Sequence, residues 1–123
     1  MASNEASNAT VLVIEDEQDI VELIKLAFRR SMPGAAVVTA DTAEDAIACA
    51  RARPAAILVD NGIPGMPTGM LVAELRKHTP ASRIVLFSAA DPVTLRRCAE
   101  DLDLPAFSKL ELPSLIDYVS KDL

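Results

Sequence analysis

The sequence predicts an α/β fold in which helices cover both faces of a five-stranded parallel sheet. Two observations lead to this prediction. Short runs of aliphatic residues, many of them β-branched, recur along the chain, and helix-length segments lie between them. Continuous apolar runs of four or five residues are typical of strands that are buried on both faces. Strands that alternate with helices form a parallel sheet through right-handed crossovers, so we expect one doubly wound domain.

Five short segments are the expected strands. Four are strongly apolar, and the fifth, which follows Pro105, is weaker. They are TVLVI (10–14), AAVVT (35–39), AAILV (55–59), RIVLF (83–87) and AFS (106–108). The nine residues before the first strand have neither a basic start nor a hydrophobic segment, so they do not form a secretory signal. We expect a disordered tail at 1–9 and one domain at 10–123.

The first two helices have clear boundaries. The first is expected at about 19–30 and is stopped by the sequence MPG at 32–34. Thr42 at the start of the second helix, with Asp45 three residues later, resembles a capping box. This helix ends before Pro54. On the first helix, 3.6-residue spacing places five residues on the inward face: Ile20, Leu23, Ile24, Ala27 and Phe28.

The remaining three helices are marked by proline and glycine. The third begins after Gly69 and breaks at Pro80. The fourth begins at Asp91, a capping residue that is followed by proline at the first helical position. The fifth follows Pro113. The residues expected to face inward are Leu71, Val72 and Leu75 on the third helix, and Leu115, Ile116 and Val119 on the fifth.

Composition excludes several classes of function. The net charge of −6 and the lack of a basic stripe argue against direct DNA binding. No apolar run approaches the roughly 18 residues that a membrane span requires, so we expect no membrane partner. Cys49 and Cys98 lack metal-ligand spacing and are expected to be free thiols, which favours a cytoplasmic location.

Polar residues stand at the ends of four of the five strands. Glu15 and Asp16 end the first strand, Asp60 the third, Ser88 the fourth and Lys109 the fifth. Because the carboxyl ends of parallel strands meet at one edge of the sheet, we expect these side chains to lie close together. The sequence therefore predicts one polar site at this edge.

The chemistry of this set is that of phosphoryl transfer. Two or three carboxylates with water suit Mg²⁺, and a carboxylate can itself attack phosphorus. Lys109 would neutralise charge on the phosphoryl group, and the Ser88 hydroxyl would donate a hydrogen bond to one of its oxygens. Glu17 and Asp19 are interpreted only as acids that favour the start of a helix.

The fragments VLVIEDE, ILVDNGIPGM, IVLFSA and FSK, in this order, resemble the receiver domain of two-component response regulators. The resemblance covers about residues 10–122. It implies a flavodoxin-like (βα)5 sandwich with strand order 2-1-3-4-5. It also implies that Asp60 is the phosphoacceptor, assisted by Lys109 and Ser88. The Mg²⁺ ligands would be Glu15, Asp16, Asp60 and the backbone carbonyl of Gly62.

The resemblance also implies the partners. A histidine kinase or a histidine phosphotransfer protein would donate the phosphoryl group and dock near the first helix and the loop after the fifth strand. Phosphorylation would change the surface of the fourth helix, fifth strand and fifth helix, about 92–121, which controls a downstream protein. The chain would catalyse its own phosphorylation and dephosphorylation without turning over an external substrate. It is expected to be a stand-alone receiver or a piece of a longer regulator.

Three features depart from the family pattern. Proline commonly follows the lysine, but here Leu110 follows Lys109. An aromatic residue usually lies three positions before the lysine, where this chain has Ala106 and places Phe107 one residue later. Either the register slips by one residue, or the aromatic switch is missing. The loop at 64–69 also carries one residue more than the commonest form.

Two other functions are alternatives to a phosphorylated receiver. A degenerate receiver would keep the fold as a constitutive protein-interaction module and would not be phosphorylated. A phosphohydrolase of the aspartyl-phosphate type would need a second acid two residues after Asp60, where this chain has Gly62. Nucleotide binding is disfavoured because no glycine-rich loop follows the first strand.

Overall fold

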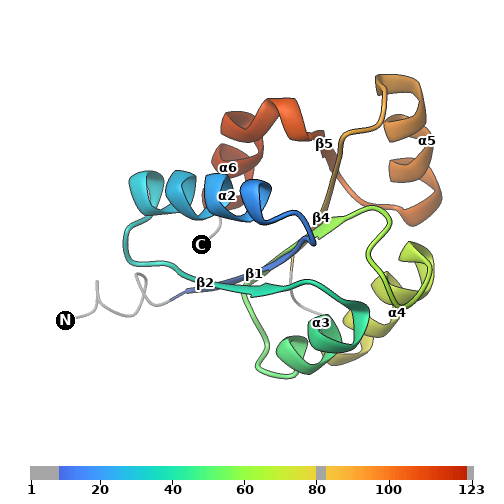
Figure 1. Cartoon of the computed structure of the whole chain (residues 1–123), viewed down its shortest axis with the longest axis horizontal. Coiled ribbons are helices and arrows are strands. Elements are labelled where there is room, and N and C mark those ends of the chain that lie inside the picture. The colour runs from blue at the N-terminus through green and yellow to red at the C-terminus, as the bar shows by residue number, and fades with distance from the viewer. Residues whose placement is uncertain (1–8, 80–82, 122–123) are drawn as a thin grey trace.

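The computed structural model describes residues 9–79 and 83–121. Within these ranges, five parallel strands form one sheet in the order β2-β1-β3-β4-β5, and helices cover both of its faces (Figure 1). The predicted fold class and strand order are therefore confirmed. Apart from Ala9, the expected tail lies outside the described residues, as does the expected helix break at Pro80.

The observed elements follow the predicted order. They are β1 (Thr10–Ile14), α2 (Gln18–Ser31), β2 (Ala36–Ala40), α3 (Ala43–Ala50), β3 (Ala56–Asp60), α4 (Thr68–His78), β4 (Arg83–Ser88), α5 (Pro92–Leu102), β5 (Ala106–Ser108), the 3₁₀ turn η1 (Lys109–Glu111) and α6 (Leu112–Ser120). Two predicted helix starts are wrong. Helix α4 begins before Gly69, because the Pro67 carbonyl already accepts a hydrogen bond from Leu71. Helix α6 begins before Pro113, because η1 leads directly into it.

Two predicted helix caps form. The Thr42 side chain accepts a hydrogen bond from the Asp45 backbone N–H at 3.1 Å. Of the predicted capping box, only this half is present among the described residues. Asp91 accepts a hydrogen bond from the Thr94 N–H at 2.9 Å, with Pro92 in the first turn as expected. These caps pair backbone donors that a helix start would otherwise leave unsatisfied.

The sheet separates two hydrophobic clusters. The α2–α6 cluster has as its buried members Val11, Val13, Ile24, Phe28, Ala56, Leu58, Val85, Phe87, Leu115, Ile116 and Val119, and Phe107 and Tyr118 are among the partly buried residues that pack against it. The α3–α4–α5 cluster contains Leu12, Ile14, Ala40, Ala43, Ala46, Ala50, Ile57, Val59, Ile63, Leu71, Val72, Leu75, Ile84, Leu86, Leu95 and Leu104. The inward residues predicted for the third and fifth helices are all buried.

Two predictions of burial are wrong. Strand β2 is not buried on both faces, and its Val38 is 40% exposed, because the strand order places β2 at an edge of the sheet. On α2, Val21, Ile24 and Phe28 are buried, whereas Leu23 is 53% exposed. The buried face of this helix follows 21, 24 and 28, at spacings of three and four residues, and Leu23 lies to the side of it.

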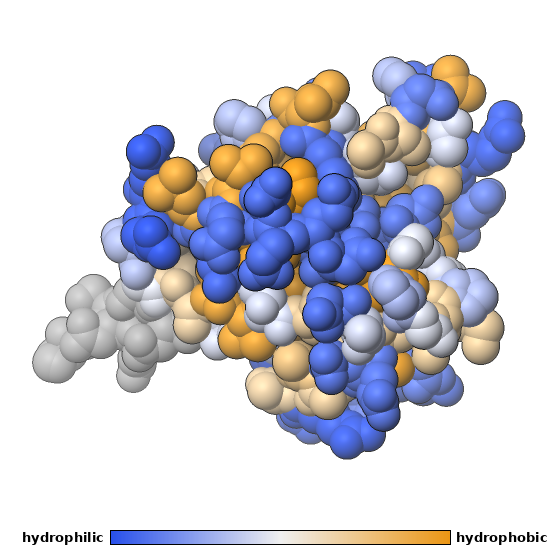
Figure 2. Space-filling model, in the orientation of Figure 1, coloured by the Kyte–Doolittle hydropathy of each residue, from blue (hydrophilic) through white to orange (hydrophobic). Residues whose placement is uncertain are grey.

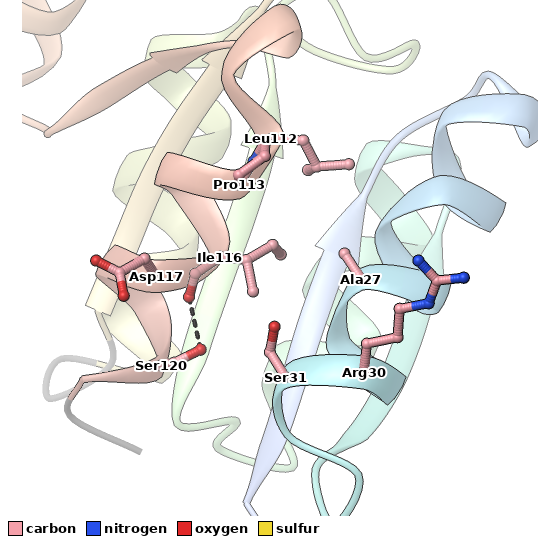
Figure 3. Close-up of a pocket in the computed structure, with 8 residues that line it drawn as sticks. All are labelled: Ala27, Arg30, Ser31, Leu112, Pro113, Ile116, Asp117 and Ser120. Carbon is pink, nitrogen blue, oxygen red and sulfur yellow. Dashed lines mark hydrogen bonds between the residues drawn. The ribbon is translucent and has the colours of Figure 1, made fainter.

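Helices α2 and α6 lie side by side on one face of the sheet, with a groove between them. The groove has a volume of about 640 Å³ and is lined by Ala27, Arg30, Ser31, Leu112, Pro113, Ile116, Asp117 and Ser120 (Figure 3). Ile116 and Ala27 point toward one another across it, while Arg30 and Asp117 lie on opposite sides. In the space-filling view, hydrophobic residues reach the surface over α2 and α6 among many hydrophilic ones (Figure 2). Among the described residues, no helix has both the length and the apolar character to cross a membrane.

Candidate functional site

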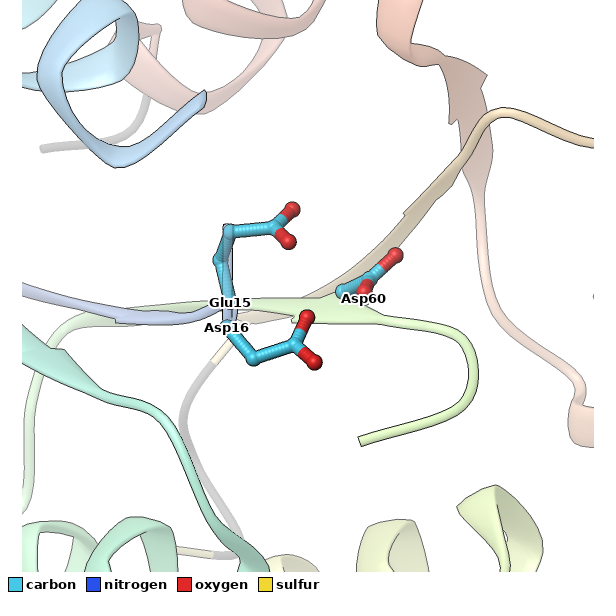
Figure 4. Close-up of side chains that lie close together, drawn as sticks. All are labelled: Glu15, Asp16 and Asp60. Atoms are coloured by element: carbon cyan, nitrogen blue, oxygen red, sulfur yellow. The ribbon is translucent and has the colours of Figure 1, made fainter. Parts of the chain in front are cut away.

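The carboxyl edge of the sheet brings the predicted acids together. Glu15 and Asp16 follow β1, and Asp60 ends the neighbouring strand β3. Their side chains reach into the same space (Figure 4), and one ligand oxygen from each lies within 4.8 Å of the others. Glu15 and Asp60 are buried, whereas Asp16 is exposed. The predicted cluster of three carboxylates is therefore present, with one side open to solvent.

Lys109 joins the acids from the far end of the sheet. Its Nζ lies 2.9 Å from Glu15 Oε1 and 3.0 Å from Asp60 Oδ1, and its side chain is 10% exposed. Burial opposes the charged form of this lysine, but its contacts with Glu15 and Asp60 outweigh that effect and raise its pKa above the ordinary value. Lys109 therefore lies between two buried carboxylates, at the sheet edge where the sequence predicted it.

Asp60 has a strongly perturbed acidity. Burial raises the pKa of its carboxyl to about 6, the negative charges of Glu15 and Asp16 act in the same direction, and Lys109 partly offsets them. A carboxylate held among other acids gains stability from any further cation placed beside it. At pH 7 the group is still mostly ionised, so it keeps the lone pairs that a nucleophile or a metal ligand needs.

Glu15 is held from two sides. Its Oε2 accepts a hydrogen bond from the Glu17 backbone N–H at 3.0 Å. Its buried Oε1 is paired with the Lys109 ammonium at 2.9 Å. Lys109 is shared between Glu15 and Asp60, so one lysine serves two buried acids and the exposed Asp16 adds a third negative charge, which favours a further cation at this site.

The donor set suits Mg²⁺. All three side chains offer carboxylate oxygen, the hard ligand that this ion prefers, and Asp16 faces solvent, which leaves room for the waters that Mg²⁺ retains. Octahedral ligands at about 2.1 Å from an ion lie roughly 3 to 4.2 Å from one another, so oxygens within 4.8 Å need only a small closure. Glu15, Asp16 and Asp60 therefore fit the ion predicted from sequence.

Ser88 lies at the same edge of the sheet. It is 6% exposed and follows Phe87, the residue that pairs with Asp60 in the neighbouring strand. Its Oγ accepts a hydrogen bond from the Ala90 N–H at 3.1 Å, so the hydroxyl proton is not used in that contact. No hydrogen bond joins Ser88 to Asp60 in the described part of the chain.

A hydrogen-bonded loop follows Asp60. Gly62 has φ of +93°, a conformation that favours glycine, and its N–H donates to Thr68 Oγ1 at 3.2 Å. The same hydroxyl donates to Asn61 Oδ1 at 2.7 Å. Thr68 thus fixes the two residues after Asp60 to the start of α4. Sequence reasoning missed this role, although a threonine directly after Pro67 at a helix start is a typical position for a side chain that bonds nearby backbone.

Glu17 also has a role beyond the one predicted. It precedes α2 as expected, but its Oε1 lies 3.8 Å from Lys109 Nζ. Its side chain is 69% exposed, so this ion pair is weak. From the sequence, Glu17 needed no such partner, because an acid at a helix start is already favoured by the helix dipole.

The loop after Lys109 takes a course that does not require proline. Residues Lys109–Glu111 form η1, and no described peptide bond is cis. Ser108 caps the turn: its Oγ accepts from the Leu110 N–H at 3.0 Å, and its own N–H donates to Glu111 Oε1 at 3.2 Å. Leu110 is 93% exposed. Lys109 still reaches both buried acids, so the loss of the usual proline leaves the site assembled.

The structure resolves the question of the aromatic position. Phe107 pairs with Phe87, and Ala106 pairs with Leu86, in a regular parallel ladder. Ala106 packs against the α3–α4–α5 cluster, whereas Phe107 packs against the α2–α6 cluster. The register has therefore not slipped, and the aromatic ring lies on the opposite face of the sheet from residue 106.

Comparisons with known proteins agree with this arrangement. The sequence profile of the response regulator receiver domain matches residues 11–107. The "Probable transcriptional regulatory protein TcrX" of Mycobacterium tuberculosis is 34% identical over 85 residues, which cover 68% of this chain and 36% of that protein. The match therefore spans only about a third of the relative's length.

Solved structures show the same fold. The receiver domain of the Francisella response regulator 1452 superposes with a TM-score of 0.76 at 21% identity, covering 94% of this chain and 98% of that one. A Burkholderia pseudomallei response regulator with a phosphorylated aspartic acid, calcium ion and citrate gives a TM-score of 0.75 at 22% identity, covering 94% of this chain and 68% of that one. With its profile match over most of its length, this chain belongs to the family of response regulator receiver domains.

Proposed function

We propose that this receiver is the phosphoacceptor switch of a two-component system. Asp60 accepts a phosphoryl group from a phosphohistidine on a histidine kinase or a histidine phosphotransfer protein, and the transfer depends on Mg²⁺. The observation that carries the proposal is the position of Asp60. It is buried beside Lys109, 3.0 Å away, and within 4.8 Å of the Glu15 and Asp16 ligand atoms.

The transfer uses the residues of the site in distinct roles. A carboxylate oxygen of Asp60 attacks phosphorus; the new O–P bond forms as the N–P bond of phosphohistidine breaks, and the bonding electrons remain on the imidazole nitrogen, which then takes a proton. Lys109 neutralises charge on the phosphoryl oxygens, and the Ser88 hydroxyl donates a hydrogen bond to one of them. Glu15, Asp16, Asp60 and the Gly62 carbonyl would hold Mg²⁺, which would add positive charge beside the phosphoryl group.

The signal follows from a shift between two conformations. When Lys109 and Ser88 engage the phosphoryl oxygens, the conformation in which they do so becomes the major one. The surface that changes is formed by α5, β5 and α6, at about 92–121, and it controls a downstream protein in the cytoplasm without direct contact with DNA. Hydrolysis of the aspartyl phosphate restores Asp60. The phosphorylated aspartic acid and calcium ion of the Burkholderia protein support this chemistry in the fold.

The test is the intact mass of the protein after incubation with acetyl phosphate, with and without Mg²⁺. We expect a gain of one phosphoryl group only with Mg²⁺, and no gain in Asp60→Asn. Asp101→Asn, which removes an exposed acid from α5, is the matched control and should react like the wild type. A folded wild-type protein that gains no mass from acetyl phosphate or from a panel of histidine kinases would instead support the constitutive interaction module.

A further inference from the structure

The two faces of the sheet differ in aromatic content. The chain has three phenylalanines, one tyrosine and no tryptophan. All four rings (Phe28, Phe87, Phe107 and Tyr118) belong to the α2–α6 cluster or pack against it. The α3–α4–α5 cluster is built from aliphatic residues, and β5 contributes to it only the methyl group of Ala106. The aromatic rings of this chain therefore lie on one face of the sheet.

A column of aromatic residues lies between the site and α6. Lys109 Nζ lies 5.5 Å from the centre of the Phe87 ring, and Phe87 pairs with Phe107 in the neighbouring strand on the same face. The Phe107 ring lies 5.4 Å from the Tyr118 ring, at an angle of 49°. The rings of Phe87, Phe107 and Tyr118 therefore follow one another on one face of the sheet, from Lys109 to α6.

Arg83 fixes the far end of this column. Its guanidinium lies 4.4 Å from the centre of the Tyr118 ring, and its Nη1 donates hydrogen bonds to the carbonyl oxygens of Tyr118 and Val119, both at 3.2 Å. The last turn of α6 is therefore held to the start of β4. The Tyr118 ring and the backbone of this turn are thus bound to the same guanidinium.

Helix α6 forms one wall of the groove against α2. Asp117, next to Tyr118 in sequence, lies on the opposite side of this groove from Arg30 (Figure 3). A movement of α6 changes the width of the groove and the distance between these two charges. On the other face, a pocket of about 450 Å³ separates the start of α5 from η1, with Leu95 and Ser108 among its lining residues.

We propose that Phe107 and Tyr118 carry the state of Asp60 to α6, so that the surface which responds to phosphorylation is the α2–α6 groove rather than α5. This rests on the proposed function and refines it: of the elements at 92–121, α6 moves and α5 changes little. Phe107, on the α2–α6 face, has the role that an aromatic residue at position 106 would have on the α3–α4–α5 face.

The chain offers a direct reporter. Tyr118 is the only tyrosine and there is no tryptophan, so tyrosine emission reports the last ring of the column, on α6. Two quantities would be measured before and after phosphorylation by acetyl phosphate with Mg²⁺: tyrosine emission, and hydrogen–deuterium exchange of the backbone at 92–102 and 112–120. Intact mass would confirm the phosphorylation. We expect a change in emission and a change of about threefold or more in exchange at 112–120, with a smaller one at 92–102.

Two variants separate the column from the rest of the core. Phe107→Leu keeps an apolar side chain and removes the ring, so it should still gain one phosphoryl group but lose most of the response at 112–120. Leu95→Val makes a similar small change on the opposite face and should keep the response. Phosphorylated wild-type protein that changes at 92–102 and not at 112–120 would overturn the inference while leaving the proposed function intact.

A third variant tests the column without a phosphoryl donor. Lys109→Met removes the ammonium above Phe87 and should alter tyrosine emission and exchange at 112–120, and it should do so far less in a Phe107→Leu background. If the wild type gains no phosphoryl group, the proposed function fails. The effect of Lys109→Met in the wild-type and Phe107→Leu backgrounds is then the test of the inference. Equal effects of Lys109→Met in both backgrounds would then reject it.

Discussion

The two faces of the sheet reach the same acid edge by different means. On the α2–α6 face, aromatic rings run from Lys109 to the last turn of α6. On the α3–α4–α5 face, small and aliphatic side chains fill the core, and the link to Asp60 is the hydrogen-bonded loop held by Thr68. In the mechanism that we propose, one face transmits a displacement from the site, and the other holds the loop after Asp60 in place.

The largest expected effect tests how each face is stabilised. Phe28→Ala removes a fully buried ring, 1% exposed, and should lower the free energy of unfolding by about 4 kcal/mol. Ala46→Gly, at a fully buried position of α3, should cost about 1 to 2 kcal/mol, from a lost methyl group and helix propensity. Urea unfolding at pH 7 measures both. Equal losses would contradict the view that the first face depends on a few large side chains.

The next effect concerns the edge that both faces share. Lys109→Ala leaves Glu15 and Asp60 without their common cation and should lower the free energy of unfolding by about 3 kcal/mol at pH 7. The loss should shrink at pH 5, because Asp60 then takes up a proton. Lys77→Ala, which breaks an exposed ion pair with Glu74, is the control and should cost less than about 0.5 kcal/mol.

The third effect isolates Asp60 in metal-free protein. The pKa of Asp60 in the folded protein, about 6, lies above the ordinary 3.8. Protonation of Asp60 therefore stabilises the folded state fully below about pH 4, and this stabilisation is lost as the pH rises through 6. Asparagine does not ionise, so the Asp60→Asn variant keeps this stabilisation at every pH. It should be more stable than the wild type by about 2 kcal/mol at pH 7, with little difference at pH 4. Unfolding with EDTA at several pH values measures the difference. A gap that is independent of pH would show that titration of Asp60 is not its cause.

The smallest effect tests the polar link on the aliphatic face. Thr68→Val keeps the shape of the side chain but removes the hydroxyl that binds Gly62 and Asn61, and should weaken Mg²⁺ binding about three- to tenfold. Thr68→Ser keeps the hydroxyl and should bind the ion like the wild type. Isothermal titration calorimetry with MgCl₂ measures both affinities. Unchanged affinity in Thr68→Val would mean that the loop holds its shape without this contact.

The sequence was a good guide to everything that depends on local pattern. Apolar runs marked the strands to within a residue at each end, and Asp91 marked a helix cap correctly. The acid site was predictable although its members lie far apart in the chain, because parallel strands must end at the same edge. Glu15, Asp16, Asp60 and Lys109 needed no further information to be grouped, and the structure brings these four together.

Only the tertiary structure decided what depends on neighbours distant in sequence. Which face of α2 is buried, and how far β2 is exposed, follow from packing and from strand order rather than from the hydrophobicity of Leu23 or Val38. The raised pKa of Asp60 arises from burial and from charges contributed by another strand. The side of the sheet on which Phe107 lies was also undecided by sequence, since a shift of one residue exchanges the two faces of a strand. Its pairing with Phe87 fixes that register and places the ring against Tyr118.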